Sequence, residues 1–238
     1  MRFLTDRERG TVAKMLAQMQ RPVEWLLVGR EDDPRSVLSR QLAEEVHALM
    51  PEQIRLSMLW TSGQETDQHS PLARGPAWAL LNHRRRPSGF RFLGLPTGYQ
   101  FGVLLNAMLD VSRQRLLVEP QTYFWCRSVR RRMNLCLMVT PTCPHSPRMA
   151  TLVQRLAFAN ASKLTATAVD ATAFADWAEA CHVQEVPWLK VAYAGSDAPA
   201  LAVTGTVGER ELVSRLKRWQ EETEEAGLVL TEQGHSCG

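Results

Sequence analysis

Apolar and polar positions along the chain follow two periodicities, one typical of strands and one typical of helices. Residues 23–28 form an apolar run of strand length, and residues 37–49 carry apolar side chains at helical spacing. The same succession returns later, where residues 134–139 form a short apolar run and residues 149–158 have a helical pattern. The pattern therefore predicts strands that alternate with helices, which is typical of α/β proteins.

The two halves of the chain repeat one another. Proline and glycine residues that end or begin corresponding elements lie at an almost constant offset. The pairs are Pro34 with Pro144, Pro76 with Pro187, and Gly94 with Gly205, separated by 110, 111 and 111 residues. This agreement predicts two copies of one structural unit, residues 1–117 and residues 118–238, with the junction near residues 116–119.

Each predicted unit has the same order of elements: helix, strand, helix, strand, helix, strand, strand, helix. Thr5 and Glu8 form a capping-box pattern at the start of the first helix, and residues 120–129 predict the corresponding helix of the second unit. This order predicts a mixed sheet flanked by helices in each unit. Because no long linker separates the units, we expect them to pack closely.

Composition narrows the class of protein. The chain has 238 residues, 45% of them hydrophobic and 22% charged, with a net charge of +3, as in an ordinary globular protein. Its tight basic runs, residues 84–86 and 130–132, are too short to predict nucleic-acid binding. No apolar stretch approaches the ~20 residues of a membrane-spanning helix, and no signal-peptide pattern opens the chain. We therefore expect a cytoplasmic protein that binds neither nucleic acid nor membrane.

Cys143 is the candidate nucleophile. It lies between the apolar run at residues 134–139 and the predicted helix at residues 149–158. Free N–H groups and the positive end of a helix dipole at such a junction favour a thiolate over a thiol. His145 and Arg148 add positive charge nearby. The pattern predicts a reactive cysteine, while an exposed His145 with no role in the chemistry is an equally good interpretation.

The other cysteines predict less. The five cysteines are odd in number and irregular in spacing, so they do not indicate a disulfide framework. Cys126 and Cys136 lie on apolar segments and are expected to be inert core thiols. Cys237, in the carboxy-terminal tail, is a weak candidate for a second reactive thiol. A zinc site at Cys143, His145, Cys181 and His182 is disfavoured, because its spacing matches no common structural pattern and Pro144 restricts the approach.

The motif around Cys143 resembles the active site of the thioredoxin superfamily. In that superfamily Cys-x-x-Cys opens the helix after the first central strand, and an X–Pro bond in the cis form faces it. Here Cys143-Pro144-His145-Ser146 stands in the first place and Val186-Pro187 in the second. The resemblance implies that Cys143 is the nucleophile. Ser146 then stands where the resolving cysteine would be.

The tandem plan is similar to two groups within this superfamily. They are the glutaredoxin-like protein disulfide oxidoreductases and the amino-terminal domain of the alkyl hydroperoxide reductase flavoprotein subunit. Residues 90–101 (FRFLGLPTGYQF) resemble a signature of both groups. Residues 140–144 (TPTCP) resemble the segment that leads into the second active site of the protein disulfide oxidoreductases. The first unit has no cysteine, since Asp33 and Ser36 occupy the places of Cys143 and Ser146, so it is expected to be redox silent.

The resemblance implies thiol–disulfide exchange by a single cysteine. Glutathione is a candidate co-substrate, because a second thiol must release the mixed disulfide and Ser146 cannot. The expected partners are a protein thiol or disulfide, or a redox partner such as a flavoprotein reductase or a peroxiredoxin. Val186 and Pro187 are expected to present backbone to an extended substrate segment. Pro144 and Trp188 are expected beside it, although a core role for Trp188 fits the sequence as well.

A second hypothesis is a non-catalytic adaptor or chaperone-like binding protein. The cysteine-free first unit and Ser146 in the second both favour loss of redox function in a fold whose peptide-binding groove persists. Two origins of Ser146 also stay open, a natural serine or a cysteine exchanged to trap substrates. The sequence predicts no resident cofactor and no metal, because it has no phosphate-binding loop and no dinucleotide fingerprint.

Overall fold

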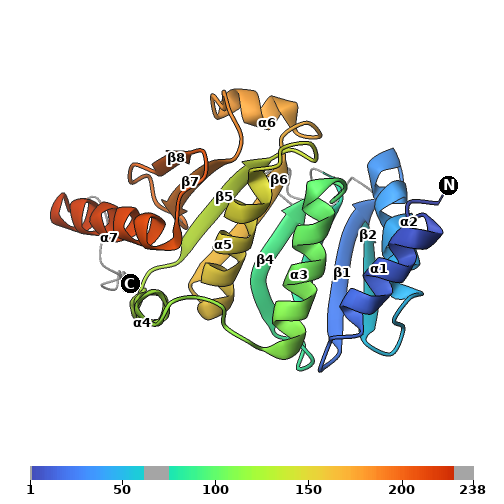
Figure 1. Ribbon diagram of the computed structural model, residues 1–238. Helices are drawn as coiled ribbons and strands as arrows, with labels where there is room; N and C mark the ends of the chain where they lie inside the picture. The colour runs from blue at the N-terminus through green and yellow to red at the C-terminus, as the bar shows by residue number, and fades with distance from the viewer. Residues whose placement is uncertain (1, 62–74, 228–238) are drawn as a thin grey trace, which may run out of the picture.

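Strands from both halves of the chain join in one sheet (Figure 1). The computed structural model describes residues 2–61 and 75–227. Within these residues the sheet has eight strands in the order β2-β1-β3-β4-β6-β5-β7-β8. Their bounds are β1 Val23–Arg30, β2 Ile54–Thr61, β3 Ala77–Leu81, β4 Pro87–Leu93, β5 Met133–Val139, β6 Leu164–Asp170, β7 Trp188–Tyr193 and β8 Leu201–Thr204.

The strand order contains the same four-strand unit twice. In the first half β1 pairs parallel with β2 and antiparallel with β3, which pairs antiparallel with β4. In the second half β5 pairs parallel with β6 and antiparallel with β7, which pairs antiparallel with β8. Two tandem thioredoxin-like repeats with mixed sheets are therefore confirmed. The exact boundary at residue 117 stays a prediction.

The joint between the repeats is a parallel pair of strands. β4 lies beside β6, with Phe90 opposite Ala166 and Leu93 opposite Val169. Because the strand that ends the first four-strand unit pairs with a strand of the second, neither β4 nor β6 is an edge of the combined sheet. The sequence indicates close packing of the repeats but does not reveal this pairing.

The helices also follow the predicted order. They are α1 Asp6–Leu16, α2 Pro34–His47, α3 Tyr99–Arg113, α4 Pro120–Ser128, α5 Ser146–Ala159, α6 Ala175–Ala180 and α7 Glu209–Glu225. The predicted capping box is present, since the Thr5 hydroxyl accepts from the backbone N–H of Glu8 and the Glu8 carboxylate accepts from that of Thr5. The helix expected between β2 and β3 falls within residues 62–74, outside the described residues.

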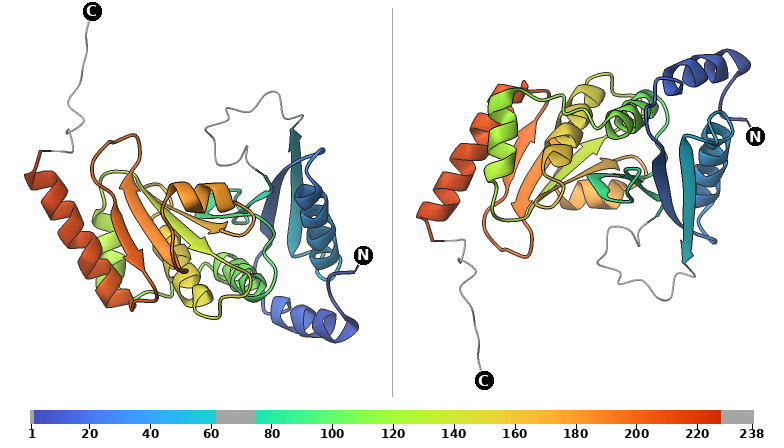
Figure 2. Two further views of the ribbon diagram at one scale, coloured as in Figure 1. Left: turned by 90° about the horizontal axis from the view of Figure 1, so that it is seen from above. Right: turned by 90° about the horizontal axis from the view of Figure 1, so that it is seen from below.

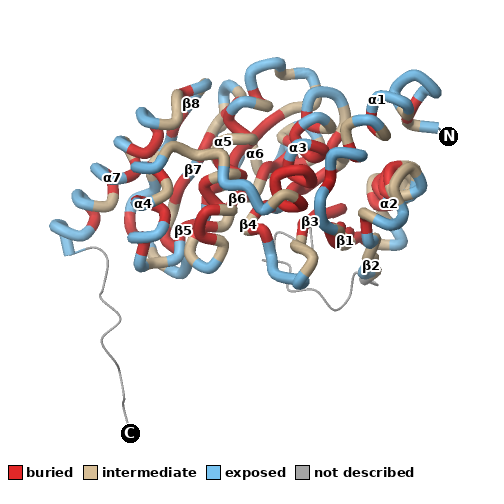
Figure 3. The backbone as a smooth tube through the Cα atoms, turned by 60° about the horizontal axis from the view of Figure 1, so that its bottom comes forward, coloured by how far each residue is buried: buried red, intermediate tan, exposed pale blue. Residues whose placement is uncertain are grey.

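The sheet separates two apolar clusters. Successive side chains of a strand point to opposite faces. Accordingly Leu135, Leu137 and Val139 of β5 belong to the larger cluster, which contains residues of all described helices except α6, while Met138 belongs to a smaller cluster around Phe174. Figure 3 shows the buried backbone concentrated in the central strands and in α3 and α5.

Helices α3 and α5 pack against each other across the joint between the repeats, as Figures 1 and 2 show. Arg155 of α5 donates through Nε to Asp110 Oδ2 of α3 at 3.1 Å, and the Asp110 side chain is only 6% exposed. A carboxylate with so little exposure requires a partner. This ion pair therefore ties the second repeat to the first. Among the described helices, none is both long and apolar enough to cross a bilayer.

Candidate functional site

Cys143 lies in the short turn between β5 and α5. The turn is closed by a hydrogen bond from the Cys143 N–H to the Thr140 carbonyl, at 3.3 Å. Helix α5 begins at Ser146, with His145 as its N-cap and Pro147 in its first turn, where proline is well tolerated. The cysteine thus precedes the helix by three residues, at the strand-to-helix junction that the sequence predicts.

The structure brings Cys143 to Val186. The Cys143 thiol is 3.5 Å from the Val186 carbonyl oxygen, to which it donates. The Val186–Pro187 peptide bond is cis, and β7 starts directly after it at Trp188. Cys143 is half-buried and Pro187 is buried. Residues separated by more than forty positions therefore meet as the resemblance implies.

Ser146 is fully buried, and its hydroxyl has no hydrogen-bond partner among the described residues. It therefore makes no hydrogen bond to the Cys143 thiol. The equivalent serine of the first repeat, Ser36, is also fully buried but is well satisfied. Its hydroxyl donates to Asp33 Oδ2 at 2.8 Å and accepts from the backbone N–H of Arg30 at 3.1 Å. Of the two sites, only that of the second repeat holds an unsatisfied hydroxyl.

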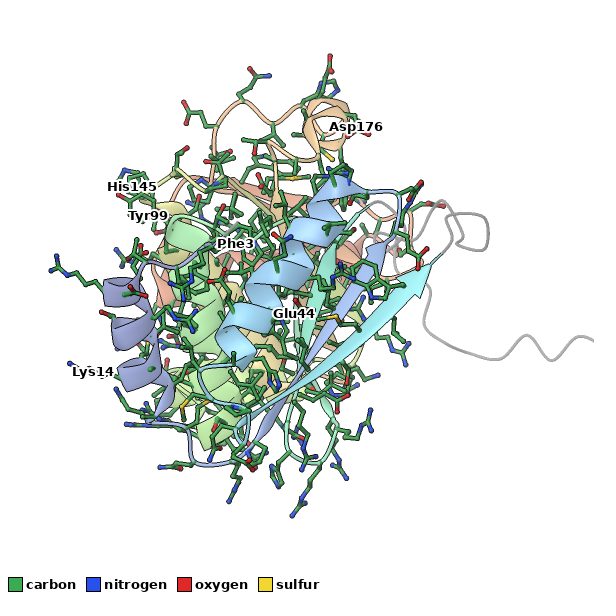
Figure 4. The ribbon with its side chains drawn as sticks, turned by 90° about the vertical axis from the view of Figure 1, so that its right-hand side faces the viewer. Phe3, Lys14, Glu44, Tyr99, His145 and Asp176 are labelled. Carbon is green, nitrogen blue, oxygen red and sulfur yellow. The ribbon has the colours of Figure 1, made fainter. Side chains whose placement is uncertain are left out.

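The remaining predicted residues surround the cysteine unevenly. Pro144, His145 and Arg148 are exposed. Figure 4 places His145 at the same end of the molecule as Tyr99 of α3 and Asp176 of α6. A hydrogen bond from the Thr206 hydroxyl to the His145 carbonyl, at 3.5 Å, connects this turn to the segment before α7. The electrostatic role expected of the His145 ring stays a prediction.

Trp188 fits both sequence interpretations in part. It is half-buried, and it packs against the smaller apolar cluster. It also follows Pro187 directly at the start of β7. The ring therefore stabilises the sheet face beside the site. A direct contact with substrate stays a prediction.

The first repeat supports the loop that carries the cysteine. The backbone N–H of Tyr99, at the start of α3, donates to the Pro141 carbonyl at 2.9 Å, and Gln100 Nε2 donates to the Thr140 carbonyl at 3.4 Å. Gly98 precedes this helix with φ +55°, and a Cβ there would clash with the Pro141 carbonyl oxygen. Our sequence interpretation missed these residues, although Gly98 lies within the motif at residues 90–101.

A shallow groove of about 630 Å³ opens beside the cysteine. Thr140 and Val186 line it next to the site, and small alanine side chains form part of its wall. The lining residues are Thr140, Ala171, Ala175, Ala178, Glu179, His182, Val183, Gln184, Glu185 and Val186. Cys143 does not line the groove itself, but its thiol contacts the carbonyl of Val186, which does. The groove therefore adjoins the thiol through Val186.

Two other cysteines, Cys126 and Cys136, have thiols that burial affects strongly. Burial raises the pKa of the Cys126 thiol to about 12, and it raises that of Cys136 to about 12 as well. Thiolates are the reactive form, so these two cysteines are inert near neutral pH, as the sequence predicts. Cys237 lies outside the described residues. Within those residues, no group of three His, Cys, Asp or Glu side chains could hold a metal ion.

Comparison with known proteins supports the fold. No protein-family model matches this chain, and no curated protein sequence matches it. Solved structures do match. A mutant of the alkylhydroperoxide reductase AhpF from Enterococcus faecalis has a TM-score of 0.77 at 18% identity, with 90% of this chain and 100% of that chain covered. A protein disulfide oxidoreductase from Aeropyrum pernix has a TM-score of 0.76 at 20% identity, with 93% and 96% covered.

A separate structure of the NTD_N/C domain of the Enterococcus faecalis protein gives a TM-score of 0.74 at 19% identity, with 90% and 100% covered. These structures come from the two groups that the sequence resembles. The chain therefore has their tandem thioredoxin fold. At these identities the likeness concerns the fold alone, because one fold can carry many functions.

Proposed function

We propose that this protein is a thiol–disulfide oxidoreductase in which Cys143 is the only nucleophile. The observation that carries the proposal is the position of the Cys143 thiol, half-buried against the Val186 carbonyl and next to Pro187. A reactive sulfur requires access, and an extended substrate requires backbone groups to pair with. The turn before α5 gives access to the sulfur, and Val186 with Pro187 offers backbone groups to the substrate.

The reaction is an exchange of sulfur partners. The Cys143 thiolate attacks one sulfur of a substrate disulfide, the substrate S–S bond breaks, and the second substrate sulfur leaves as a thiolate that takes a proton from water. Cys143 is then joined to the substrate in a mixed disulfide. A thiol from solution, with glutathione as our candidate, attacks this bond and restores Cys143. Each step breaks one S–S bond and forms another.

Neighbouring residues have supporting roles in this proposal. The positive charge of a protonated His145 near the turn stabilises the thiolate, and Pro144 fixes the chain between them. Trp188 provides an apolar surface next to Pro187. Ser146 occupies the resolving position without resolving chemistry. We propose a protein thiol or disulfide as the substrate, or a redox partner such as a flavoprotein reductase or a peroxiredoxin, in the cytoplasm.

The adaptor remains the second candidate, because one observation favours it. Both positions that could hold a second site thiol are serines, Ser36 and Ser146, and the first repeat has Asp33 in the place of a nucleophile. A fold that has lost these thiols can still bind an extended chain in the groove beside Val186. The two candidates differ in the reactivity expected of Cys143.

Mixed-disulfide formation tests the proposal. The reduced protein is mixed with glutathione disulfide or an aromatic disulfide at pH 7, and adducts are counted by mass spectrometry of the intact protein and its peptides. We expect one adduct to form rapidly at Cys143 and none at Cys126 or Cys136. The rapid reaction should be absent in Cys143→Ser. The variant Ser146→Cys should shorten the lifetime of the adduct, because the introduced thiol displaces it.

The contrary result is equally clear. If Cys143 reacts no faster than the same cysteine in an unfolded peptide, the site does not activate its thiol and the adaptor is favoured. Cys136→Ser serves as the matched control, because it removes a thiol that burial already makes inert. Its adduct rate should equal that of the unaltered protein.

A further inference from the structure

Arg35 of the first repeat reaches into the second. It lies in the cysteine-free turn, residues 33–36, which runs into the first turn of α2 and corresponds by the repeat offset to residues 143–146. Its Nη1 donates to the Ala173 carbonyl at 2.7 Å, and its guanidinium carbon lies 5.3 Å from the centre of the Phe174 ring. Ala173 and Phe174 lie between β6 and α6. One side chain thus connects the cysteine-free turn to the segment that leads into α6.

The contacts of Arg35 are fixed on the first-repeat side as well. Its Nε donates to Asp33 Oδ1 at 3.0 Å. Partial burial alone would raise the pKa of Asp33, but hydrogen bonds from Arg35 and Ser36 outweigh it and hold that pKa below its usual value. Gly75 packs against the pair, since a Cβ there would lie 3.2 Å from the Phe174 ring and 3.3 Å from the guanidinium. A charged hydrogen bond with both ends held is among the stronger polar contacts in proteins.

The segment held by Arg35 builds one wall of the groove. Phe174 is 3% exposed and is the N-cap of α6. Ala171, Ala175 and Ala178 line the groove from this side. The backbone N–H of Ala171 also donates to the Val139 carbonyl at 2.8 Å, directly before the turn that carries the cysteine. A shift at Ala173 would therefore move the wall of the groove without touching the thiol.

We propose that Arg35 is a positioning residue for substrate binding, and that the cysteine-free turn of the first repeat clamps α6 so that the groove beside Cys143 keeps its shape. The inference rests on the proposed function. The clamp acts on extended protein substrates, which need the groove. It does not act on a small disulfide, which needs the thiol but not the groove.

The test compares two arginines of α2. Arg35→Met removes the clamp and keeps the aliphatic stem of the side chain. Arg40→Met removes the same charge from the same helix, but among the described residues Arg40 pairs with Glu44 and lies over the ring of Trp60, both in the first repeat. Arg35→Lys keeps a cation near the Ala173 carbonyl. Each variant is assayed with insulin disulfides as the protein substrate, with glutathione as the reductant, and with an aromatic disulfide as the small substrate. Hydrogen exchange is followed in residues 171–178.

We expect Arg35→Met to exchange faster in residues 171–178 and to raise KM for insulin about tenfold, as loss of one charged hydrogen bond implies, with kcat and the rate with the aromatic disulfide unchanged. Arg40→Met should leave all these values unchanged. Arg35→Lys should have a KM for insulin close to that of the unaltered protein. Unchanged exchange in Arg35→Met would refute the clamp, and faster exchange with an unchanged KM would refute its role in binding. If the unaltered protein reacts with neither disulfide, the proposed function itself fails.

Discussion

At the scale of single residues, Ser36 and Ser146 form an internal comparison. They occupy equivalent positions in the two repeats, and both are fully buried. Ser36 has two hydrogen bonds, whereas the Ser146 hydroxyl has no partner among the described residues. A buried hydroxyl without a partner has lost its hydration and gained nothing in return. The hydroxyl of Ser146 is therefore not what stabilises the start of α5.

Alanine substitution should separate these two serines. Ser36→Ala leaves the Arg30 N–H and the Asp33 carboxylate each short of a partner, so we expect a loss of about 1–2 kcal/mol in the free energy of unfolding. Ser146→Ala removes an unsatisfied group, so we expect no loss or a small gain. Urea denaturation of the two variants measures both values. Equal losses would show that the Ser146 hydroxyl has a partner in solution.

At the scale of elements, the sequence predicts what is local or repeated. The capping box at Thr5 is recognised from four consecutive residues. The strand-to-helix junction at Cys143 is predicted by the spacing of apolar residues on each side of it. The approach of Cys143 to Val186, next to Pro187, follows from a motif that resembles one of a known superfamily. These features depend on neighbours in the chain or on a pattern that recurs elsewhere, so a single sequence is sufficient to find them.

The sequence does not predict contacts between unlike parts of the two repeats. The hydrogen bond from Tyr99 to the Pro141 carbonyl and that from Arg35 to the Ala173 carbonyl both depend on which strands meet at the joint. An offset of about 110 residues relates equivalent positions in the two repeats. It does not indicate which strand of the first repeat pairs with which strand of the second. The sequence interpretation includes a peptide-binding groove but not its α6 wall, because that wall is anchored from the other repeat.

The turn at residues 33–36 should respond to acid. Because the pKa of Asp33 is lower in the folded protein than its usual value of about 3.9, its ionised form adds stability that is present above that value and lost as the pH falls through the lower folded pKa. We expect Asp33→Asn to be less stable than the unaltered protein by a constant amount above about pH 5. The difference should shrink as the pH falls further. Thermal unfolding of both proteins between pH 2.5 and 6 measures it, and a difference that grows on acidification would contradict the ion pair with Arg35.

At the scale of the whole molecule, the repeats share a sheet and do not fold around separate ones. β4 and β6 are central strands only because they pair with each other, and Phe92 and Ala168 at this joint are buried. α3 and α5 cover the joint, and the ion pair of Asp110 with Arg155 spans it. If either repeat unfolded alone, it would leave the other with an uncovered strand edge and with Asp110 or Arg155 without its partner.

The chain should therefore unfold as one cooperative unit, although it contains two copies of one structural unit. Hydrogen exchange in β1 of the first repeat and in β5 of the second should lose protection at the same urea concentration. The same measurement on Ser36→Ala is a stricter test of cooperativity, because this substitution lies in the first repeat. We expect it to lower the midpoint in both strands equally. A lower midpoint in β1 with an unchanged one in β5 would mean that the joint between β4 and β6 is too weak to couple the repeats, and that the second repeat keeps its site without help from the first.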